Sequence, residues 1–361
     1  MYRDLVPGAL FRSHGADGRG HGLGAAADFQ VRRPASTCAQ AGLRSGTPFA
    51  SFGVVFRISH VSDLHVLSPF GFEWRRALFN KRLTGYANLI RQRGRVHRRE
   101  YLLAVLSEAA EHSDHVVVTG DIVNLSLESE YEEAAKLLSD VSRKVDVTVV
   151  PGNHDVYLPS IHKHRRFPHH FRQFLRSDLP ELSRDLPMGP FPCVKLRGPV
   201  ALIALSSAVP RPPFVASGFI GHVQLEAFEA ALAHPEVARR TPVILVHHPP
   251  VDRRMTLERL RDGLVDAVRL RHSLSRVTRA LVLYGHVHYR SRQRLPTAAG
   301  AAEIVSASGA GLDHPKPAVR AGFNMYSFTG DGGIASADAR VIAPDGRSLE
   351  RVPIPGWEEL A

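Results

Sequence analysis

Cysteine is scarce in this sequence, and the scarcity argues against two kinds of site. Only Cys38 and Cys193 occur among 361 residues, and they lie far apart, with no Cys-x-x-Cys spacing. A disulfide framework needs several paired cysteines, and a zinc–thiolate site needs them at short spacing. The cysteine content therefore argues against both and fits a reducing compartment.

Long apolar runs are also missing. No stretch approaches the roughly 20 apolar residues that a helix needs to cross a bilayer. The N-terminus lacks the apolar core of a signal peptide, because Arg3, Asp4, Arg12 and Asp17 interrupt it. We therefore expect a cytoplasmic protein, with a location peripheral to the membrane as the alternative.

Acidic residues are outnumbered. The chain has 46 Lys and Arg against 35 Asp and Glu, a net charge of +11 and a pI of about 10.1. Such a balance favours anionic partners such as phosphate esters, nucleic acid or an anionic membrane face. The alternative is that the net charge binds nothing, as in many soluble basic proteins.

Much of the excess charge lies in residues 72–99, which hold nine Lys or Arg and one Glu. Apolar residues recur among them at helical spacing: Trp74, Leu78, Phe79, Leu83, Tyr86, Leu89 and Ile90. This pattern predicts a basic amphipathic insertion at residues 68–99. The insertion either packs its apolar stripe on the domain or acts as a lid or membrane-surface element that gathers anionic substrate.

The remaining chain divides simply. Residues 1–53 are rich in Gly, Ala, Ser and Arg without a sustained period, so we expect a poorly ordered tail. Residues 54–361 read as one domain, with helices predicted at 99–112, 128–143 and 222–234. A further helix is predicted at 256–272, with the following side chains facing inward: Leu257, Leu260, Leu264, Val265 and Val268.

Strands and helices alternate in the first part of this domain, which predicts parallel strands joined by right-handed crossovers. After His288 the pattern changes to short strands separated by Gly and Pro. That change predicts antiparallel strands, which we expect to form a second sheet packed on the first.

Five short polar motifs each follow a β-rich run. They are Asp63-Leu64-His65, Gly120-Asp121, Gly152-Asn153-His154-Asp155, His247-His248-Pro249-Pro250 and Gly285-His286-Val287-His288. Side chains at the carboxyl ends of buried strands point into the crevice where open α/β sheets bind ligands. Oxygen and imidazole donors without a thiolate would converge there, which predicts a metal site.

The ordered set of motifs resembles the calcineurin-like metallophosphoesterase superfamily, over residues 54 to about 330. The stretch from Ile58 to His65, Ile-Ser-His-Val-Ser-Asp-Leu-His, resembles the opening of the bacterial cyclic-nucleotide phosphodiesterase branch. The resemblance implies an α/β protein, a four-layer α/β/β/α sandwich with mixed sheets. It also implies two metal ions.

The same resemblance implies which residues hold the metals. The first metal would take Asp63, His65, Asp121 and His288, and the second would take Asp121, Asn153, His247 and His286. Asp121 would bridge the two. His247 is chosen over His248 because it is the first residue past its strand.

The resemblance also implies that His154 would meet the substrate. Asp155, beside it, is expected to orient His154 or cap its loop. His60 is a candidate for the same outer role, against the simpler interpretation of a strand histidine. The glycines at 120, 152 and 285 are expected to give the ligand turns a tight or positive-φ backbone.

The predicted chemistry follows from two adjacent cations. Cations ~3.5–4 Å apart bind phosphoryl oxygens, and a water held between them becomes hydroxide near neutral pH and attacks phosphorus. A shared carboxylate keeps the pair close, and His154 can donate a proton to the leaving oxygen. Mixed nitrogen and oxygen ligation suits Mn, Fe, Zn or Co, and the sequence does not choose among them.

The favoured function is therefore a dinuclear metal-dependent phosphodiesterase acting on an anionic phosphoester. One alternative is a membrane-surface hydrolase of a lipid or nucleotide-sugar pyrophosphate, motivated by residues 72–99. A phosphomonoesterase or a nuclease is another, although no partner coiled coil or added DNA-binding domain is evident, so nucleic acid ranks low. A metal-free interaction module is disfavoured because no motif ligand is missing. The oligomeric state is not predicted.

Overall fold

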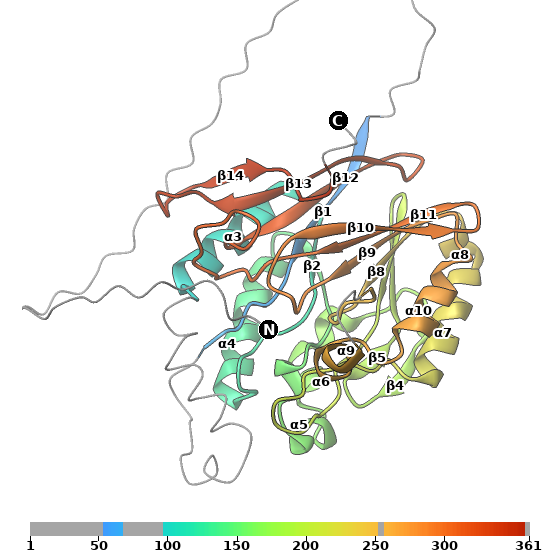
Figure 1. The fold of residues 1–361 in the computed structure, drawn as a ribbon, viewed down its shortest axis with the longest axis horizontal. Coiled ribbons are helices and arrows are strands. Elements are labelled where there is room, and N and C mark those ends of the chain that lie inside the picture. Colours follow the sequence, from blue (N-terminus) through green and yellow to red (C-terminus); the bar gives the residue numbers. More distant parts are fainter. Residues whose placement is uncertain (1–52, 68–96, 252–255, 358–361) are drawn as a thin grey trace, which may run out of the picture. The chain divides into compact units, whose positions relative to one another are not determined.

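The computed structural model describes residues 53–67, 97–251 and 256–357, all within one compact unit, Thr37–Ala361 (Figure 1). The predicted tail up to residue 52 and the basic segment from 68 to 96 lie outside the described residues. Of the insertion predicted at residues 68–99, only residues 97–99 are described: His97 forms an isolated bridge, and the next helix begins at Arg99.

The first sheet has six strands in the order β14-β13-β12-β1-β2-β3. Its strands are β1 (Val54–Val61), β2 (His115–Val118), β3 (Asp146–Val149), β12 (Gly322–Thr329), β13 (Ile334–Ile342) and β14 (Leu349–Val352). Strands β1, β2 and β3 are parallel, and β12 to β14 add to β1 in antiparallel fashion.

The second sheet also has six strands, in the order β10-β11-β9-β8-β7-β6. Its strands are β6 (Cys193–Arg197), β7 (Val200–Ala204), β8 (Thr241–Leu245), β9 (Arg279–Tyr284), β10 (Ser291–Thr297) and β11 (Gly300–Ser306). Strands β7, β8, β9 and β11 are parallel, and β6 and β10 are antiparallel edges. A small hairpin pairs β4 (Arg184–Leu186) with β5 (Gly189–Phe191).

The longer helices in the described ranges are α3 (Arg99–His112), α4 (Glu128–Ser142), α7 (His222–Ala233) and α10 (Ala267–Leu274). Shorter ones are α5 (Pro159–Lys163), α6 (Arg166–Phe171), α8 (Pro235–Ala238) and α9 (Thr256–Asp262). Short 3₁₀ turns occur at η2 (His154–Val156), η3 (Arg172–Leu175) and η4 (Pro180–Leu182).

The alternation of side chains along β7 shows how the layers are built. Leu202 and Ala204 join the core cluster that also holds the apolar side chains of the first sheet, whereas Ala201 and Ile203 join a second cluster with residues of α7 and α10. Successive strand residues point to opposite faces of a sheet. The second sheet is therefore covered by the first sheet on one face and by helices on the other, as Figure 1 shows.

This is an α/β fold with two mixed sheets, as predicted. The expected origin of the second sheet was wrong, however. Strands after His288 do not form a sheet of their own: β10 and β11 extend β9, while β12 to β14 return to β1. The pairing of β11 with β9 is parallel rather than antiparallel. Short alternating strands carry no signal for which open sheet edge they will cover.

The helix predicted at 256–272 is broken in the structure. It divides into α9 and α10, and the intervening Leu264 forms a bridge with Gly218. Only Leu264 of the described predicted core positions is buried, whereas Leu260, Val265 and Val268 are exposed. The side chain of Leu257 lies outside the description. The break at Gly263 shifts the helical phase, so that Leu270 and Leu274 face the core instead.

Candidate metal centre

The five motifs lie at the carboxyl ends of strands from both sheets. Asp63, Asp121 and Asn153 follow β1, β2 and β3, while His247 and His286 follow β8 and β9. The two sets meet, because His247 Nδ1 lies 2.7 Å from the Thr119 carbonyl oxygen and the His286 N–H donates to the Asp63 carboxylate. The convergence expected for one sheet is thus achieved by two.

One cluster matches the residues predicted for the first metal. One ligand atom from each of Asp63, His65, Asp121 and His288 lies within 4.8 Å of the others. His288 Nε2 lies 3.1 Å from Asp63 Oδ1 and 3.2 Å from His65 Nε2. Two carboxylates and two imidazoles therefore point at one volume.

The residues predicted for the second metal also converge. The Asn153 Oδ1 atom lies 2.9 Å from His286 Nδ1 and 3.1 Å from His247 Nε2. His247 Nε2 also lies 3.4 Å from Asp121 Oδ2. Asp121 consequently adjoins both groups, which is the position a bridging carboxylate must have.

The donor chemistry of His247 tests whether a cation fits between these groups. A neutral His247 that donates its Nδ1–H to the Thr119 carbonyl presents a lone pair at Nε2. That lone pair faces the oxygens of Asn153 and Asp121. Three acceptors directed at each other repel unless a positive charge lies between them, so these residues fit a metal ion.

The electrostatics of the protein alone lead to the same conclusion. Burial lowers the pKa of His247, but the Asp121 carboxylate beside it outweighs burial, and the pKa rises to about 9. Burial raises the pKa of Asp121, yet the neighbouring His247 and His154 hold it well below its usual range. The buried Asp121 carboxylate therefore favours a positive charge beside it.

His248 is close to the second group but is engaged elsewhere. One nitrogen of each of His247, His248 and His286 lies within 4.8 Å of the others. Both nitrogens of His248 nevertheless have partners, the Ser207 hydroxyl at 2.7 Å and the Ala216 carbonyl at 2.8 Å. The geometry therefore favours His247 as the ligand and gives His248 a supporting place behind it.

The backbone at the motif residues is strained. Positive φ angles occur at these ligand candidates: Asp63 (51°), His65 (44°), Asp121 (50°), His286 (69°) and His288 (54°). Left-handed conformations are costly for residues other than glycine and persist where the surroundings enforce them, often at functional sites. The positive φ angles expected at the motif glycines therefore occur mostly at the candidate ligands instead.

Two glycines are required by space rather than by φ. A Cβ atom at Gly152 would lie 2.2 Å from Asp121 Oδ1, and one at Gly285 would lie 2.0 Å from Ser62 Oγ. Of the three motif glycines, only Gly120 has a positive φ, at 94°. The ligand loops therefore approach so closely that a side chain at Gly152 or Gly285 would occupy the place of a neighbouring side-chain oxygen.

His154 lies at the rim of the first cluster. Its ring meets the His65 ring edge-on, with 4.9 Å between centroids, and its Nδ1 lies 2.5 Å from the Asn124 carbonyl. Its backbone N–H donates to Asp121 Oδ1 at 2.7 Å. The main chain of His154 thus helps to fix Asp121, while the ring stands beside the site.

Asp155 holds two ligand loops together. Its carboxylate accepts hydrogen bonds from the backbone N–H groups of Val123 and Gly152 at 2.9 and 2.8 Å. Burial, together with the charge of Asp121, raises the pKa of Asp155 to about 7. Of the two roles predicted for Asp155, these bonds support loop capping, which makes it a positioning residue.

His60 contributes indirectly. It is fully buried, and its Nε2 lies 2.8 Å from the Thr119 hydroxyl. The Thr119 carbonyl in turn contacts His247. Burial lowers the pKa of His60 to about 3, so the ring is neutral. His60 is therefore linked to His247 only through Thr119.

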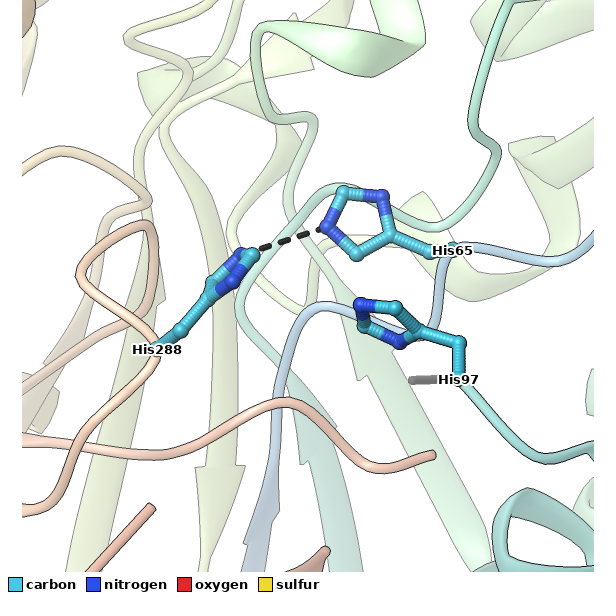
Figure 2. A group of neighbouring side chains, drawn as sticks. All are labelled: His65, His97 and His288. Atoms are coloured by element: carbon cyan, nitrogen blue, oxygen red, sulfur yellow. Dashed lines mark hydrogen bonds between the residues drawn. The ribbon is translucent and has the colours of Figure 1, made fainter. Parts of the chain in front are cut away.

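Sequence reasoning missed two participants. Thr119 orients His247 through its main-chain carbonyl. Every residue has such a carbonyl, so the sequence gives no sign of this role. His97 groups with His65 and His288 (Figure 2). No β-rich run precedes His97 in the sequence, so the strand-end pattern that marked the predicted ligands does not include it.

Comparison with known proteins agrees with this description. The family profile described as calcineurin-like phosphoesterase matches residues 56–290. The match covers more than half of the chain, so the protein belongs to this family of metal-dependent phosphoesterases. Its two clusters of His and Asp are consistent with two metal ions. A search among curated protein sequences gives no match.

Several solved structures are similar to this chain at low identity. A dimetal phosphatase from Danio rerio is 15% identical, with 83% of this chain and 98% of that chain covered and a TM-score of 0.48. A purple acid phosphatase from yellow lupin (Lupinus luteus) is 13% identical, covering 78% of this chain and 53% of that chain, with a TM-score of 0.49. A 5′-nucleotidase from Candida albicans is 14% identical, covering 80% and 52%, with a TM-score of 0.42.

Proposed function

We propose that the protein is a two-metal phosphodiesterase. The observation that carries the proposal is the pair of ligand clusters that meet at Asp121: Asp63, His65 and His288 on one side, and Asn153, His247 and His286 on the other. When bound there, two cations would neutralise the phosphoryl group and lower the pKa of a water between them.

The residues of the chain supply the rest of the chemistry. The Asp63 and Asp121 side chains are nearly or fully buried. Water therefore screens their charges little, and they act strongly on groups within the site. His154 holds one proton on Nδ1 against the Asn124 carbonyl, so a second proton at Nε2 is the one it can give. His154 is accordingly the proposed general acid for the leaving oxygen.

The choice of a diester rests on the resemblance of residues 58–65 to the cyclic-nucleotide branch. We test it by hydrolysis of bis(p-nitrophenyl) phosphate and p-nitrophenyl phosphate, using chelator-stripped protein with Mn, Fe, Zn, Co or Mg added back. We expect metal-dependent cleavage of the diester over the monoester. Preference for the monoester would make the protein a phosphatase. Folded, metal-loaded protein that cleaves neither would contradict the proposal.

The partner and location predictions are tested separately. We propose an anionic phosphoester as substrate and a cytoplasmic location. Binding of residues 72–99 to an anionic membrane is the competing idea, and co-sedimentation with anionic vesicles checks it. Loss of sedimentation on deletion of residues 68–96 would favour the membrane-surface hydrolase, whereas no sedimentation of the full chain would dismiss it.

A further inference from the structure

The three histidines in Figure 2 form a group that extends beyond the expected ligand set. We propose that His97 supplies a third imidazole to the first metal position, beside His65 and His288. The inference rests on the proposed two-metal site and deepens it. Its consequence is a first position richer in nitrogen than the second, with a correspondingly different preference among metals.

The main chain around His97 is held in place from the far end of the sequence. His97 forms an antiparallel bridge with Leu312, and the Arg98 N–H donates to the Gly311 carbonyl at 2.7 Å. The Arg98 side chain forms an ion pair with Asp313 at 2.6 Å. Helix α3 then begins at Arg99, so His97 is fixed between a helix start and a paired loop.

The loop that holds His97 is also tied to the metal ligands. Gly309 forms a parallel bridge with Ser62, and the Ala310 N–H donates to the Ser62 carbonyl at 3.0 Å. Ser62 immediately precedes Asp63. A Cβ at Gly309 would lie 3.5 Å from His97 Cε1, so the ring rests directly on this loop. His97 and Asp63 are therefore positioned by the same piece of backbone.

The rings are arranged as imidazoles around a common point. His97 lies edge-on to His65, with 5.1 Å between centroids and 72° between planes, and edge-on to His288, with 6.1 Å and 79°. One nitrogen from each of the three rings lies within 4.8 Å of the others. Ligands of one cation are separated by up to about twice the ~2.0–2.1 Å metal–nitrogen distance, so a small inward movement of His97 completes the set.

His97 approaches from the side of the imidazoles. It groups with His65 and His288, whereas the group that contains Asp63 and Asp121 does not include it. The first position would then combine three imidazoles with two carboxylates. The second would combine two imidazoles with an amide oxygen and the shared carboxylate.

This difference predicts metal selectivity. Imidazole ligands favour Zn, Fe and Co, whereas oxygen ligands suit Mn and Mg. Removing one imidazole from the first position should therefore weaken Zn²⁺ or Co²⁺ binding more than Mn²⁺ binding. The second position, which His97 does not reach, should keep its affinity.

The test measures metal binding rather than catalysis. Full-length, chelator-stripped wild-type protein and His97→Phe are titrated with Co²⁺ and Mn²⁺ by calorimetry, and the visible spectrum of the Co²⁺ form is recorded. Phe keeps a ring for the edge-on contacts but has no nitrogen. His112→Phe, at the last residue of α3, where His112 pairs with Glu108, is the matched control. Thermal unfolding of the stripped proteins checks that each variant folds, and His97→Gln replaces His97→Phe if it does not.

We expect one of the two Co²⁺ sites to lose at least about 10-fold in affinity in His97→Phe, with a smaller loss for Mn²⁺ and a changed Co²⁺ spectrum. His112→Phe should match the wild type. Unchanged affinity and spectrum for both sites would overturn the proposal. So would a rise in KM with unchanged metal binding, since His97 would then contact substrate. Absence of metal binding in the wild type would instead refute the two-metal site itself.

Discussion

The two sheets contribute unlike halves of the metal centre. The first sheet presents both carboxylates and the amide oxygen, at Asp63, Asp121 and Asn153, together with His65. The second sheet presents imidazoles only, at His247, His286 and His288. The acidic ligands therefore come from one sheet, and the other sheet contributes imidazoles only.

The comparison shows what joins the two sheets at this end. The loops interlock through Thr119 with His247 and through Asp63 with the His286 N–H, but they also bring lone pairs face to face. Cations between them would turn repulsion into attraction. A metal bound here would act as a clamp between sheets as well as a reagent, because binding to the native state alone adds to its stability.

The largest expected effect comes from breaking the shared carboxylate. Asp121→Ala removes the group that adjoins both clusters, so we expect loss of both metals and of activity, beyond the ~10²–10³-fold typical of removing one transition-state donor. Metal content and diester hydrolysis measure the two losses. Full activity in this variant would defeat the idea that the two halves meet at Asp121.

The next effect separates chemistry from metal binding. His154→Ala deletes the ring but keeps the backbone N–H that donates to Asp121. We expect turnover to fall by about 10²–10⁴-fold, as for loss of a general acid, with both metals retained. Metal analysis beside steady-state kinetics provides the check. Metal loss equal to that of Asp121→Ala would show that the ring belongs to the ligand set.

A smaller effect tests how tightly the two sheets meet. In Gly285→Ala the new Cβ would lie 2.0 Å from Ser62 Oγ and 2.6 Å from Asp63 Oδ2, which forces the sheet ends apart. We expect destabilisation of about 1–3 kcal/mol in urea unfolding, together with weaker metal binding. Gly330→Ala is the control, because nothing lies within 4 Å of its added Cβ. Equal stability of the two variants would mean that the sheets have room to adjust.

The last comparison separates the site histidines from a structural histidine, His115. His115 begins β2, at the end opposite the site, and burial lowers its pKa to about 3. Between pH 6.5 and 3 the unfolded chain binds a proton there that the folded chain does not, so stability falls as the pH falls. His115→Gln should flatten this slope by up to about 1.4 kcal/mol per pH unit. Urea unfolding at pH 6.5, 5.5 and 4.5 measures it, and an unchanged slope would show that His115 is not neutral when folded.

The sequence specified much of the local structure. Helix α3 has the predicted bounds, and α4 and α7 end within a residue of them, because their apolar spacing is regular. The ligand motifs stand out as a set, because five polar motifs each follow a β-rich run. The helix predicted at 256–272 failed where Gly263 let the chain break and pair Leu264 with Gly218.

Other features were decided only in three dimensions. The strands after His288 chose their sheets by covering the open edges of β9 and β1, a choice between partners that no strand encodes alone. The structure favours His247 over His248 as the ligand, because Ser207 and Ala216 contact both nitrogens of His248. His97 reached the site only because a loop more than 200 residues away pairs with it. Local periodicity and residue chemistry are written along the chain, whereas contacts between distant segments depend on how the whole chain packs.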